Sequence, residues 1–321
     1  MKKRFLRAGL ALAAMACLSP AWAQKFSDRP VTLVVPFAAG GNLDLVARTV
    51  APALGQALGQ AVIVDNRTGA GGAIGASYVA RAQPDGHTLL VSTPNALVVL
   101  PLMTKTTYGL DNFTPVGLMA TTSLVMVVKG EGPYASIEAL LATARARSGQ
   151  IAAGHAGPGT TNHVALLQLE EAGKLKFNAV PYKGSAPALT DLMGGQIDLV
   201  VDQLTSSAAH IQSGALRAVA VMSRERDPAL PNVPTLREAG LSDFVATTAT
   251  GLLAPAGTPQ DIVNALNAAL HKALADDAVK RRLISVGSPG KSSSPAEWLA
   301  TLKNEEASAK VLAKADKLKS D

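Results

Sequence analysis

The stretch VTLVVPFAAGGNLDLVAR, residues 31–48, decides the fold. Its first five residues are apolar or β-branched and predict a short buried strand over 31–35. Pro36 and the run 38–41, which ends in two glycines, break that strand. Asn42 precedes apolar residues with helical spacing, so we expect it to be the N-cap of a helix.

This strand–loop–helix unit has two interpretations. A helix N-terminus presents unpaired backbone N–H groups at the positive end of the helix dipole, which favours an anion site. Every parallel α/β protein also needs a turn after its first strand, and glycine is common in such turns. The loop has neither a Walker A motif nor the GxGxxG dinucleotide motif, so the sequence does not indicate nucleotide binding.

The first 23 residues have the features of a secretory signal peptide. Residues 2–7 include four basic residues, residues 8–18 are apolar, and Ala21-Trp22-Ala23 forms a cleavage site. Cys17 raises a lipoprotein alternative, although the usual leucine three positions upstream is missing. Cleavage after Ala23 leaves a mature chain without cysteine, which excludes disulfides and thiol chemistry.

Composition places the chain among α/β proteins of one large or two smaller domains. It has 321 residues, of which 48% are hydrophobic and only 4% aromatic. The formal charge of +6 falls to +2 without the four basic residues of the signal segment, since 26 Lys and Arg then face 24 Asp and Glu. A nearly neutral mature chain gives no indication of nucleic-acid binding.

The unit at 31–48 is repeated along the chain. Further strands are predicted at 61–64 and 88–91, and this succession predicts a parallel sheet with right-handed crossovers. In the second half, a strand at 151–153 leads into GHAGPGTTNH, residues 154–163, and then a helix at 164–172. Two such loops, one in each half, are typical of a cleft that closes on a ligand, because ligands bind at the carboxyl ends of parallel strands.

The remaining elements are predicted from their apolar patterns. Residues 116–120 and 124–128 are expected to form two strands, with others at 178–180, 197–201, 216–222 and 252–255. Pro52 is expected to kink or break the first helix. The C-terminal region is expected to be helical over 260–274, 277–286 and 295–319.

Four polar residues have competing interpretations. His163, in the first turn of its helix, can bind a ligand carboxylate or pack as a capping residue. Lys183 can be solvated or supply positive charge to an anion site. Asp44 and Asp202 can be imagined as an acid–base pair, but a carboxylate in the first turn of a helix is better explained by the dipole. Beside an anionic ligand Asp44 has to point away or act through water.

Motifs for metal or covalent chemistry are missing from the sequence. The five histidines show no HxxxH or HExxH spacing, and no GxSxG elbow is present. We therefore expect no metal and no cofactor, and a secreted hydrolase or isomerase remains only as an alternative hypothesis.

Six segments together resemble the substrate-binding receptors of tripartite tricarboxylate transporters, the Bug family. They are RPVTLVVPFAAGGNLDLVAR, VDNRTGAGGAIGASYVARAQPDGHTLL, GPGTTNHVALLQLE, VPYKGSAPALTDLMGGQIDLVVD, LPNVPTLREAG and GLLAPAGTP. The resemblance implies an α/β protein with the two-lobed type II periplasmic-binding-protein fold, each lobe a mostly parallel sheet flanked by helices. Residues 24–122 and 223–321 are expected to form domain 1, and residues 123–222 domain 2.

The resemblance also implies a function. The chain is expected to be a periplasmic monomer that captures a small organic carboxylate and delivers it to a membrane transporter, and not an enzyme. A receptor that signals rather than feeds a transporter is the alternative. Matched position by position, the expected ligand-binding residues are Ala38, Ala39, Gly40, Gly41, Asn42, Asp44, Thr93, Gly157, Gly159, Thr160, Thr161, Asn162, His163, Lys183 and Asp202.

Three positions differ from the family pattern. Ala249-Thr250 stands where an aromatic pair is frequent, Ala179 where histidine is frequent, and Leu100-Pro101 where Asn-Pro is common. These differences lie near the expected cleft, so they affect which ligand fits rather than the class of function.

Overall fold

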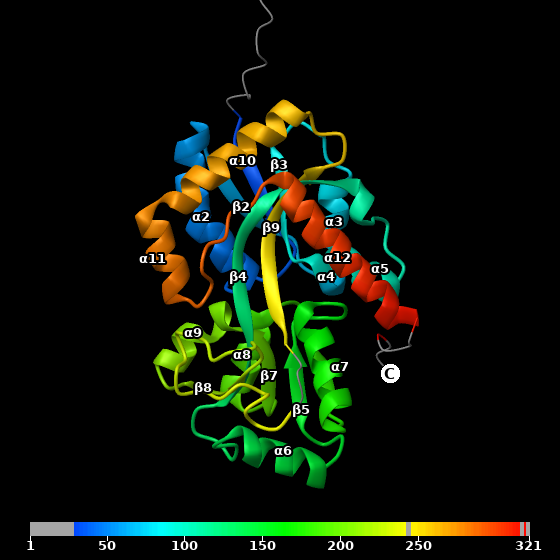
Figure 1. The fold of residues 1–321 in the computed structure, drawn as a ribbon, viewed down its shortest axis with the longest axis vertical. Helices are drawn as coiled ribbons and strands as arrows, with labels where there is room; N and C mark the ends of the chain where they lie inside the picture. Colours follow the sequence, from blue (N-terminus) through cyan, green and yellow to red (C-terminus); the bar gives the residue numbers. More distant parts are fainter. Residues whose placement is uncertain (1–28, 242–244, 315–317, 319–321) are drawn as a thin grey trace, which may run out of the picture.

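The computed structural model describes residues 29–241, 245–314 and 318. The predicted signal peptide, residues 1–23 with Cys17, lies outside the described residues. The chain forms two lobes placed one above the other (Figure 1). The upper lobe combines the N-terminal and C-terminal parts of the chain, and the lower lobe is formed by its middle part. This arrangement confirms the predicted two-lobed α/β fold.

The strands form one continuous path in the order β2-β1-β3-β9-β4-β7-β5-β6, with β8 also paired to β4. Pairs within β2-β1-β3 and within β7-β5-β6 are parallel, whereas β4 and β9 run antiparallel to their neighbours. The strands are β1 Val31–Val35, β2 Val62–Asn66, β3 Thr88–Ser92, β4 Phe113–Lys129, β5 Ala152–His155, β6 Asn178–Pro181, β7 Leu199–Gln203, β8 Leu216–Val221 and β9 Thr247–Pro255.

Helices cover both faces of each half of this sheet (Figure 1). In the upper lobe they are α2 Asn42–Leu58, α3 Ala73–Ala80, α4 Pro94–Val98, α5 Leu100–Met103, α10 Gln260–Ala275, α11 Asp277–Ser285 and α12 Pro295–Lys314, with the 3-10 turns η1 Ala70–Gly72 and η2 Leu110–Asn112. In the lower lobe they are α6 Ile137–Ala146, α7 Thr161–Gly173, α8 Ser185–Gly194 and α9 Leu204–Gln212. Among the described residues, no helix is both long and apolar enough to cross a membrane.

One long strand joins the lobes where two short ones were predicted. β4 is a single strand of 17 residues, so the prediction of separate strands at 116–120 and 124–128 is wrong. Its first part pairs with β9 as far as Ser123, and from Leu124 onward it pairs with β7 and β8. The hydroxyl-bearing residues between the two apolar runs do not interrupt the strand, because the pairing with β9 continues through them.

The hydrophobic core has two layers in each lobe. In the upper lobe one cluster packs α2, α10 and α11 on the sheet, and a second packs α3, α4 and α12 on its other face. In the lower lobe α6 and α7 cover one face, and α8 and α9 cover the other. The largest fully buried side chain is Trp298 of α12. Each lobe therefore has a core of its own.

The first helix differs from its prediction at two points. Gly41, with extended backbone, is the N-cap, and Asn42 is the first helical residue. The Asn42 side chain does not cap the helix, because its amide contacts Thr250 of β9 instead. The helix also continues through Pro52 without a break, since α2 is a single helix of 17 residues packed on the sheet.

Candidate functional site

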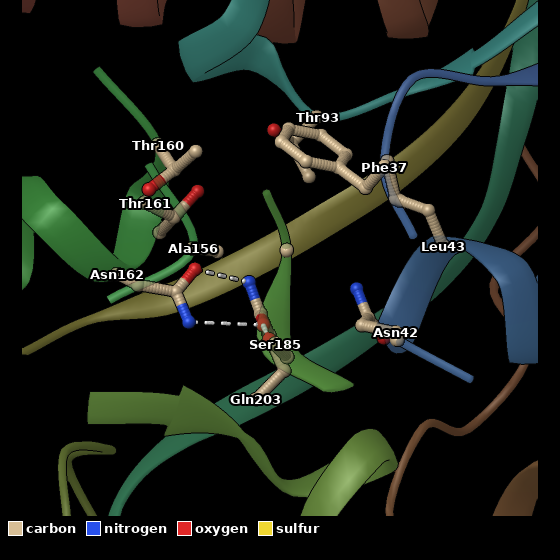
Figure 2. Close-up of a pocket in the computed structure, with 12 residues that line it drawn as sticks. Phe37, Asn42, Leu43, Thr93, Ala156, Thr160, Thr161, Asn162, Ser185 and Gln203 are labelled. Carbon is tan, nitrogen blue, oxygen red and sulfur yellow. Dashed lines mark hydrogen bonds between the residues drawn. The ribbon is translucent and has the colours of Figure 1, made fainter. Parts of the chain in front are cut away.

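A pocket lies between the lobes at the carboxyl ends of the strands (Figure 2). Its empty volume is about 340 Å³, part of which is open to solvent. Both lobes contribute to its wall, so a ligand held there contacts both. The lining residues are Phe37, Gly41, Asn42, Leu43, Thr93, Ala156, Thr160, Thr161, Asn162, Gly184, Ser185 and Gln203.

Several helices begin at the pocket. Gly41, Thr93, Thr160 and Gly184 are the N-caps of α2, α4, α7 and α8, and each of them lines the pocket. The first residues of a helix have no intrahelical partner for their N–H groups. In α2, for example, the first intrahelical bond is donated by Leu45 to Gly41. The aligned dipoles and unpaired N–H groups make this pocket electrostatically positive and suited to an anion.

No charged side chain lining the pocket contributes to this positive field. Of the twelve residues that line it, none is a Lys, Arg, Asp, Glu or His. In the described part of the chain, no group of three or more His, Cys, Asp and Glu side chains is placed to hold a metal ion. The donors available to a ligand are therefore backbone N–H groups, hydroxyls and amides.

The lower wall of the pocket is a network of three polar side chains (Figure 2). Gln203 Nε2 donates to Asn162 Oδ1 at 2.9 Å, and Asn162 Nδ2 donates to Gln203 Oε1 at 3.1 Å. Asn162 Nδ2 also donates to the carbonyl of Val201 at 2.9 Å, and the Ser185 hydroxyl donates to Gln203 Oε1 at 3.3 Å. Gln203 thus joins the N-termini of α7 and α8 into one polar surface.

The first predicted loop contributes only its end to the pocket. Gly41 and Asn42 line it, whereas Ala39 and Gly40 are exposed at the surface. Ala38 makes a contact between the lobes, because its N–H donates to the carbonyl of Lys183 at 3.1 Å. The lobes therefore touch at the edge of the pocket.

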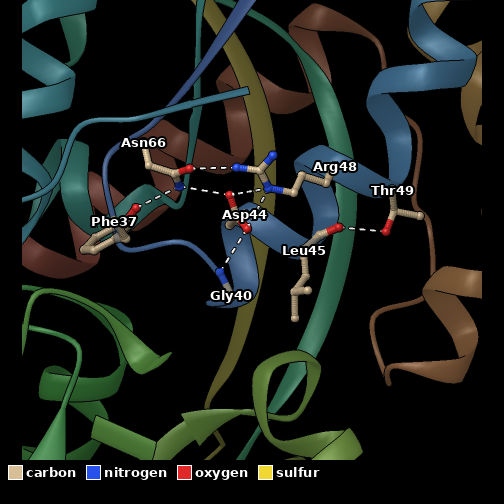
Figure 3. A network of polar contacts seen from close by, with 7 residues as sticks. All are labelled: Phe37, Gly40, Asp44, Leu45, Arg48, Thr49 and Asn66. Carbon is tan, nitrogen blue, oxygen red and sulfur yellow. Dashed lines mark hydrogen bonds and ion pairs between the residues drawn. The ribbon is translucent and has the colours of Figure 1, made fainter. Parts of the chain in front are cut away.

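Asp44 belongs to a separate polar cluster on the far side of the loop (Figure 3). Its Oδ2 accepts from the Gly40 N–H at 2.9 Å, and Arg48 Nε donates to both carboxylate oxygens at 3.0 Å. Asn66 Nδ2 donates to Oδ1 at 2.9 Å and to the carbonyl of Phe37 at 3.0 Å. Asp44 is buried, does not line the pocket, and holds the glycine-rich loop in shape.

The second predicted loop divides in a similar way. Thr160, Thr161 and Asn162 line the pocket. The N–H groups of Gly157 and Gly159 are directed to two histidine rings behind it. Gly157 N–H donates to His155 Nδ1 and Gly159 N–H to His163 Nδ1, both at 3.2 Å.

The two rings, of His155 and His163, stack with their centroids 4.4 Å apart. Burial lowers the pKa of each to about 4, and for His155 the neighbouring His163 ring contributes to the lowering of the pKa. Both rings are therefore neutral near pH 7, with Nδ1 free to accept. His163 does not line the pocket; it holds the backbone of the loop that does.

The remaining predicted residues lie at different depths. Thr93 lines the pocket from the upper lobe. The Lys183 side chain is exposed, and only its carbonyl contributes a contact between the lobes. Asp202 is fully buried beneath the pocket, where the Ser206 hydroxyl donates to its Oδ2 at 2.6 Å. Burial raises the pKa of Asp202 to about 6.

Sequence reasoning did not identify six of the lining residues. They are Phe37, Leu43, Ala156, Gly184, Ser185 and Gln203. Gln203 is the last residue of β7, and Ser185 is the first residue of α8. The rule that ligands bind at the carboxyl ends of strands points to both positions. Phe37 and Leu43 carried no such signal, because an apolar residue beside a turn is usually part of the core.

Comparisons with known proteins agree with this geometry. The sequence profile of the tripartite tricarboxylate transporter family receptor matches residues 46–311. Protein BugT of Bordetella pertussis is 37% identical over 284 residues, which are 87% of this chain and 86% of BugT.

Two solved structures are similar over most of their length. MatC from Rhodopseudomonas palustris with bound malate has a TM-score of 0.84 and 34% identity, over 89% of this chain and 99% of MatC. R. palustris Rpa4515 with adipate has a TM-score of 0.84 and 35% identity, over 91% of this chain and 97% of Rpa4515. Proteins of this kind are solute-binding receptors and not enzymes. The chain belongs to the tripartite tricarboxylate transporter receptor family, the Bug family of solute-binding proteins.

Proposed function

We propose that this protein captures a small organic carboxylate between its lobes and delivers it to a membrane transporter of the tripartite tricarboxylate type. The observation that carries the proposal is the convergence of helix N-termini from both lobes on one pocket without charged side chains. Backbone dipoles at helix N-termini favour an anion and disfavour a cation. MatC with malate and Rpa4515 with adipate support a carboxylate as that anion.

Ligand capture proceeds by approach of the lobes. The first turn of α2 meets the ligand from the upper lobe, and the first turns of α7 and α8 meet it from the lower lobe. Gln203 adds a side-chain donor from below, because Nε2 uses only one of its two hydrogens to bond Asn162 Oδ1, while Asn162 and Ser185 hold the amide of Gln203 in place. Closure is then completed by contacts such as Ala38 N–H to Lys183 carbonyl. The ligand stabilises the closed form because only that form provides both sets of donors.

The proposal includes the organisation of the chain. We divide residues 24–122 of domain 1 from residues 123–222 of domain 2 at the point where β4 changes partners, after Ser123. Leu236, Leu241 and Ala246 pack in the lower-lobe core, so we place the return of the chain to domain 1 near Thr247, where β9 begins, rather than at residue 223. The protein is exported to the periplasm with cleavage after Ala23 and acts as a monomer. The family to which the chain belongs supports export and transporter delivery.

Calorimetry on the mature chain from Gln24, unfolded and refolded to remove bound ligand, tests this function. We expect saturable binding of at least one class of small carboxylate, and an increase in melting temperature by mass action. The variant Gln203→Glu places a negative charge in the pocket at nearly constant shape, so it should weaken carboxylate binding more than tenfold. Gln260→Glu, at the exposed start of α10, is the matched control and should bind like the wild type.

Tighter ligand binding by Gln203→Glu would show that the cargo is cationic and would refute the proposal. Delivery is tested separately by deleting the gene for this protein. Loss of uptake of the acid identified by calorimetry is expected, and unchanged uptake would leave binding in place but contradict delivery.

A further inference from the structure

A buried carboxyl group without a charged partner lies directly behind the pocket. Asp202 is fully buried, and in β7 it precedes Gln203, which lines the pocket. The Ser206 hydroxyl donates to its Oδ2 at 2.6 Å, whereas Oδ1 is buried and has no hydrogen-bond partner in the described part of the chain. No ion pair joins Asp202 to a Lys, Arg or His in that same part of the chain. A negative charge is costly in such surroundings, so this carboxyl accepts a proton readily.

The neighbouring titratable groups do not neutralise Asp202. Side chains alternate along a strand, so Asp202 points to the same face of the sheet as Val200, which α8 and α9 cover. On these helices Asp191 accepts from the Tyr182 hydroxyl at 2.7 Å, and His210 lies in the last turn of α9. The titratable groups on the other elements packed around β7 are the exposed Lys129 at the end of β4 and, over the opposite face, the stacked rings of His155 and His163.

Ser185 connects this carboxyl to the pocket. It is the first residue of α8 and lines the pocket, and its hydroxyl donates to Gln203 Oε1 at 3.3 Å. The same hydroxyl interacts with the Asp202 carboxylate and favours its charged form. One hydroxyl proton cannot be donated to both acceptors at once. An ionised Asp202 draws this proton away from Gln203, whereas a protonated Asp202 can donate to Ser185 Oγ and leave the Ser185 proton on Gln203.

We propose that capture of the carboxylate is coupled to protonation of Asp202, so that the pocket takes up its anion together with a proton from solvent. The inference rests on the proposed function, since it presupposes an anion in this pocket. Asp202 does not touch the ligand; it is a positioning residue that acts through Ser185 and Gln203.

Two causes act in the same direction. A carboxylate bonded to Gln203 Nε2 repels an ionised Asp202 through buried protein rather than through water, which makes the repulsion stronger. The protonated form also keeps the Ser185 hydroxyl on Gln203 Oε1, and this fixes the amide that meets the ligand. The bound anion therefore favours the proton, and the proton favours the bound anion.

Calorimetric titrations at pH 7 measure the proton uptake, because the observed enthalpy then depends on the ionisation enthalpy of the buffer. Burial raises the pKa of Asp202 to about 6, so the carboxyl is only about one-tenth protonated at pH 7 without ligand. The probes are succinate, malate and adipate, and the most tightly bound is titrated in Bis-Tris and in Tris buffer, neither of which is an anion. We expect uptake of at least about 0.4 proton for each acid bound, which corresponds to a tenfold effect of the ligand on the proton affinity of Asp202. The acids are almost fully ionised at this pH, so their own protons contribute little.

The decisive variant is Asp202→Asn, which keeps the shape of the side chain but cannot take up a proton. Its uptake should fall below about 0.1 proton. Asp261→Asn, at the exposed start of α10, is the matched control and should keep the wild-type uptake. Since the coupling is reciprocal, the affinity of the wild type relative to Asp202→Asn for the same acid should increase about fivefold from pH 8 to pH 6.

An infrared difference spectrum of the wild type needs no variant. With an acid that carries ¹³C in its carboxyl groups, the C=O band of an unlabelled protonated carboxyl should appear on binding. Absence of this band together with absence of proton uptake would overturn the inference.

Failure of this inference is distinguishable from failure of the proposed function. If an acid binds the wild type without proton uptake, the inference fails and the proposed function stands. If Asp202→Asn takes up as much proton as the wild type, the proton is held elsewhere, for example on the His155 and His163 rings, and the inference is overturned. If none of the acids binds, the proposed function fails and the inference fails with it.

Discussion

The substitution Asp202→Asn should make the protein less sensitive to rising pH. The side chain is fully buried in the lower lobe, in the strand that pairs with β4. Burial raises the pKa of Asp202 from 3.8 to about 6 in the folded chain. The folded state therefore holds more protons than the unfolded state between these values. The stability that protonated Asp202 contributes at low pH is lost as the pH rises through 6, and the loss is complete above pH 6.

The difference between the unfolded pKa of 3.8 and the folded pKa of about 6 corresponds to a loss of about 3 kcal/mol of unfolding free energy, at 1.36 kcal/mol for each pKa unit. Asparagine carries no charge at any of these pH values, so the variant avoids this loss. The difference in unfolding free energy between variant and wild type should thus increase by about 3 kcal/mol in favour of the variant from pH 4 to pH 7. Contributions from other titrating groups cancel in this difference when both proteins share them.

Urea unfolding of the ligand-free proteins, followed by circular dichroism at pH 4 to 8, measures the effect. Ser206→Ala provides an internal check. It removes the hydrogen bond that the Ser206 hydroxyl donates to the carboxylate, so it should move the pH midpoint of the wild-type loss upward. A difference between Asp202→Asn and wild type that stays constant from pH 4 to pH 7 would falsify the reasoning, because it would mean that burial does not penalise this charge.

Three further predictions concern other parts of the molecule. Trp298→Ala should lower the unfolding free energy by about 3–5 kcal/mol in a chemical denaturation experiment, because the ring is fully buried on the sheet. A loss of unfolding free energy below about 1 kcal/mol would contradict that packing. Burial lowers the pKa of His155 and His163 to about 4, so the unfolded state binds more protons than the folded state below pH 6.5. The free energy of unfolding should therefore fall by about 3 kcal/mol per ring between pH 6.5 and 4. A His155→Asn, His163→Asn double variant should lose much less unfolding free energy over this range, and an equal loss would exclude the rings as the cause. Gly184→Val places a β-branched residue at a φ of +131° with its Cβ only 3.1 Å from the Ala38 nitrogen. Ligand affinity measured by calorimetry should therefore fall at least tenfold. Wild-type affinity would show that the lobes close without the close approach of residues 184 and 38.

The sequence was informative where one local pattern determined the structure. The strand, loop and helix at 31–48 were predicted correctly, since the apolar run, the glycines and the helical spacing all act within a few residues. The extent of the crossing strands β4 and β9 was not predicted. β9 begins at Thr247, five residues before its apolar core, because pairing with β4 extends it, and no local pattern records that pairing.

The sequence predicted the backbone positions of the site better than the contacts of its side chains. Gly41, Thr93 and residues 160–162 line the pocket, as expected for positions at helix N-termini. Asn42 lines it too, but its expected role as N-cap was wrong, because its amide contacts a strand 208 residues further along the chain. Such a contact depends on how the two crossing strands are placed, and their placement depends on packing throughout the fold rather than on a local sequence pattern.

The helix N-termini that form the pocket have a consequence for how this kind of receptor evolves. A peptide group cannot be removed by a point mutation, and it does not titrate, so a positive field built from helix ends persists whatever side chains surround it. Affinity for carboxylates as a class is then inherited with the backbone. Positions such as Asn42, Ser185 and Gln203 are left free to vary. One scaffold can thereby acquire new cargoes by single substitutions, without passing through an intermediate that has lost the ability to bind acids.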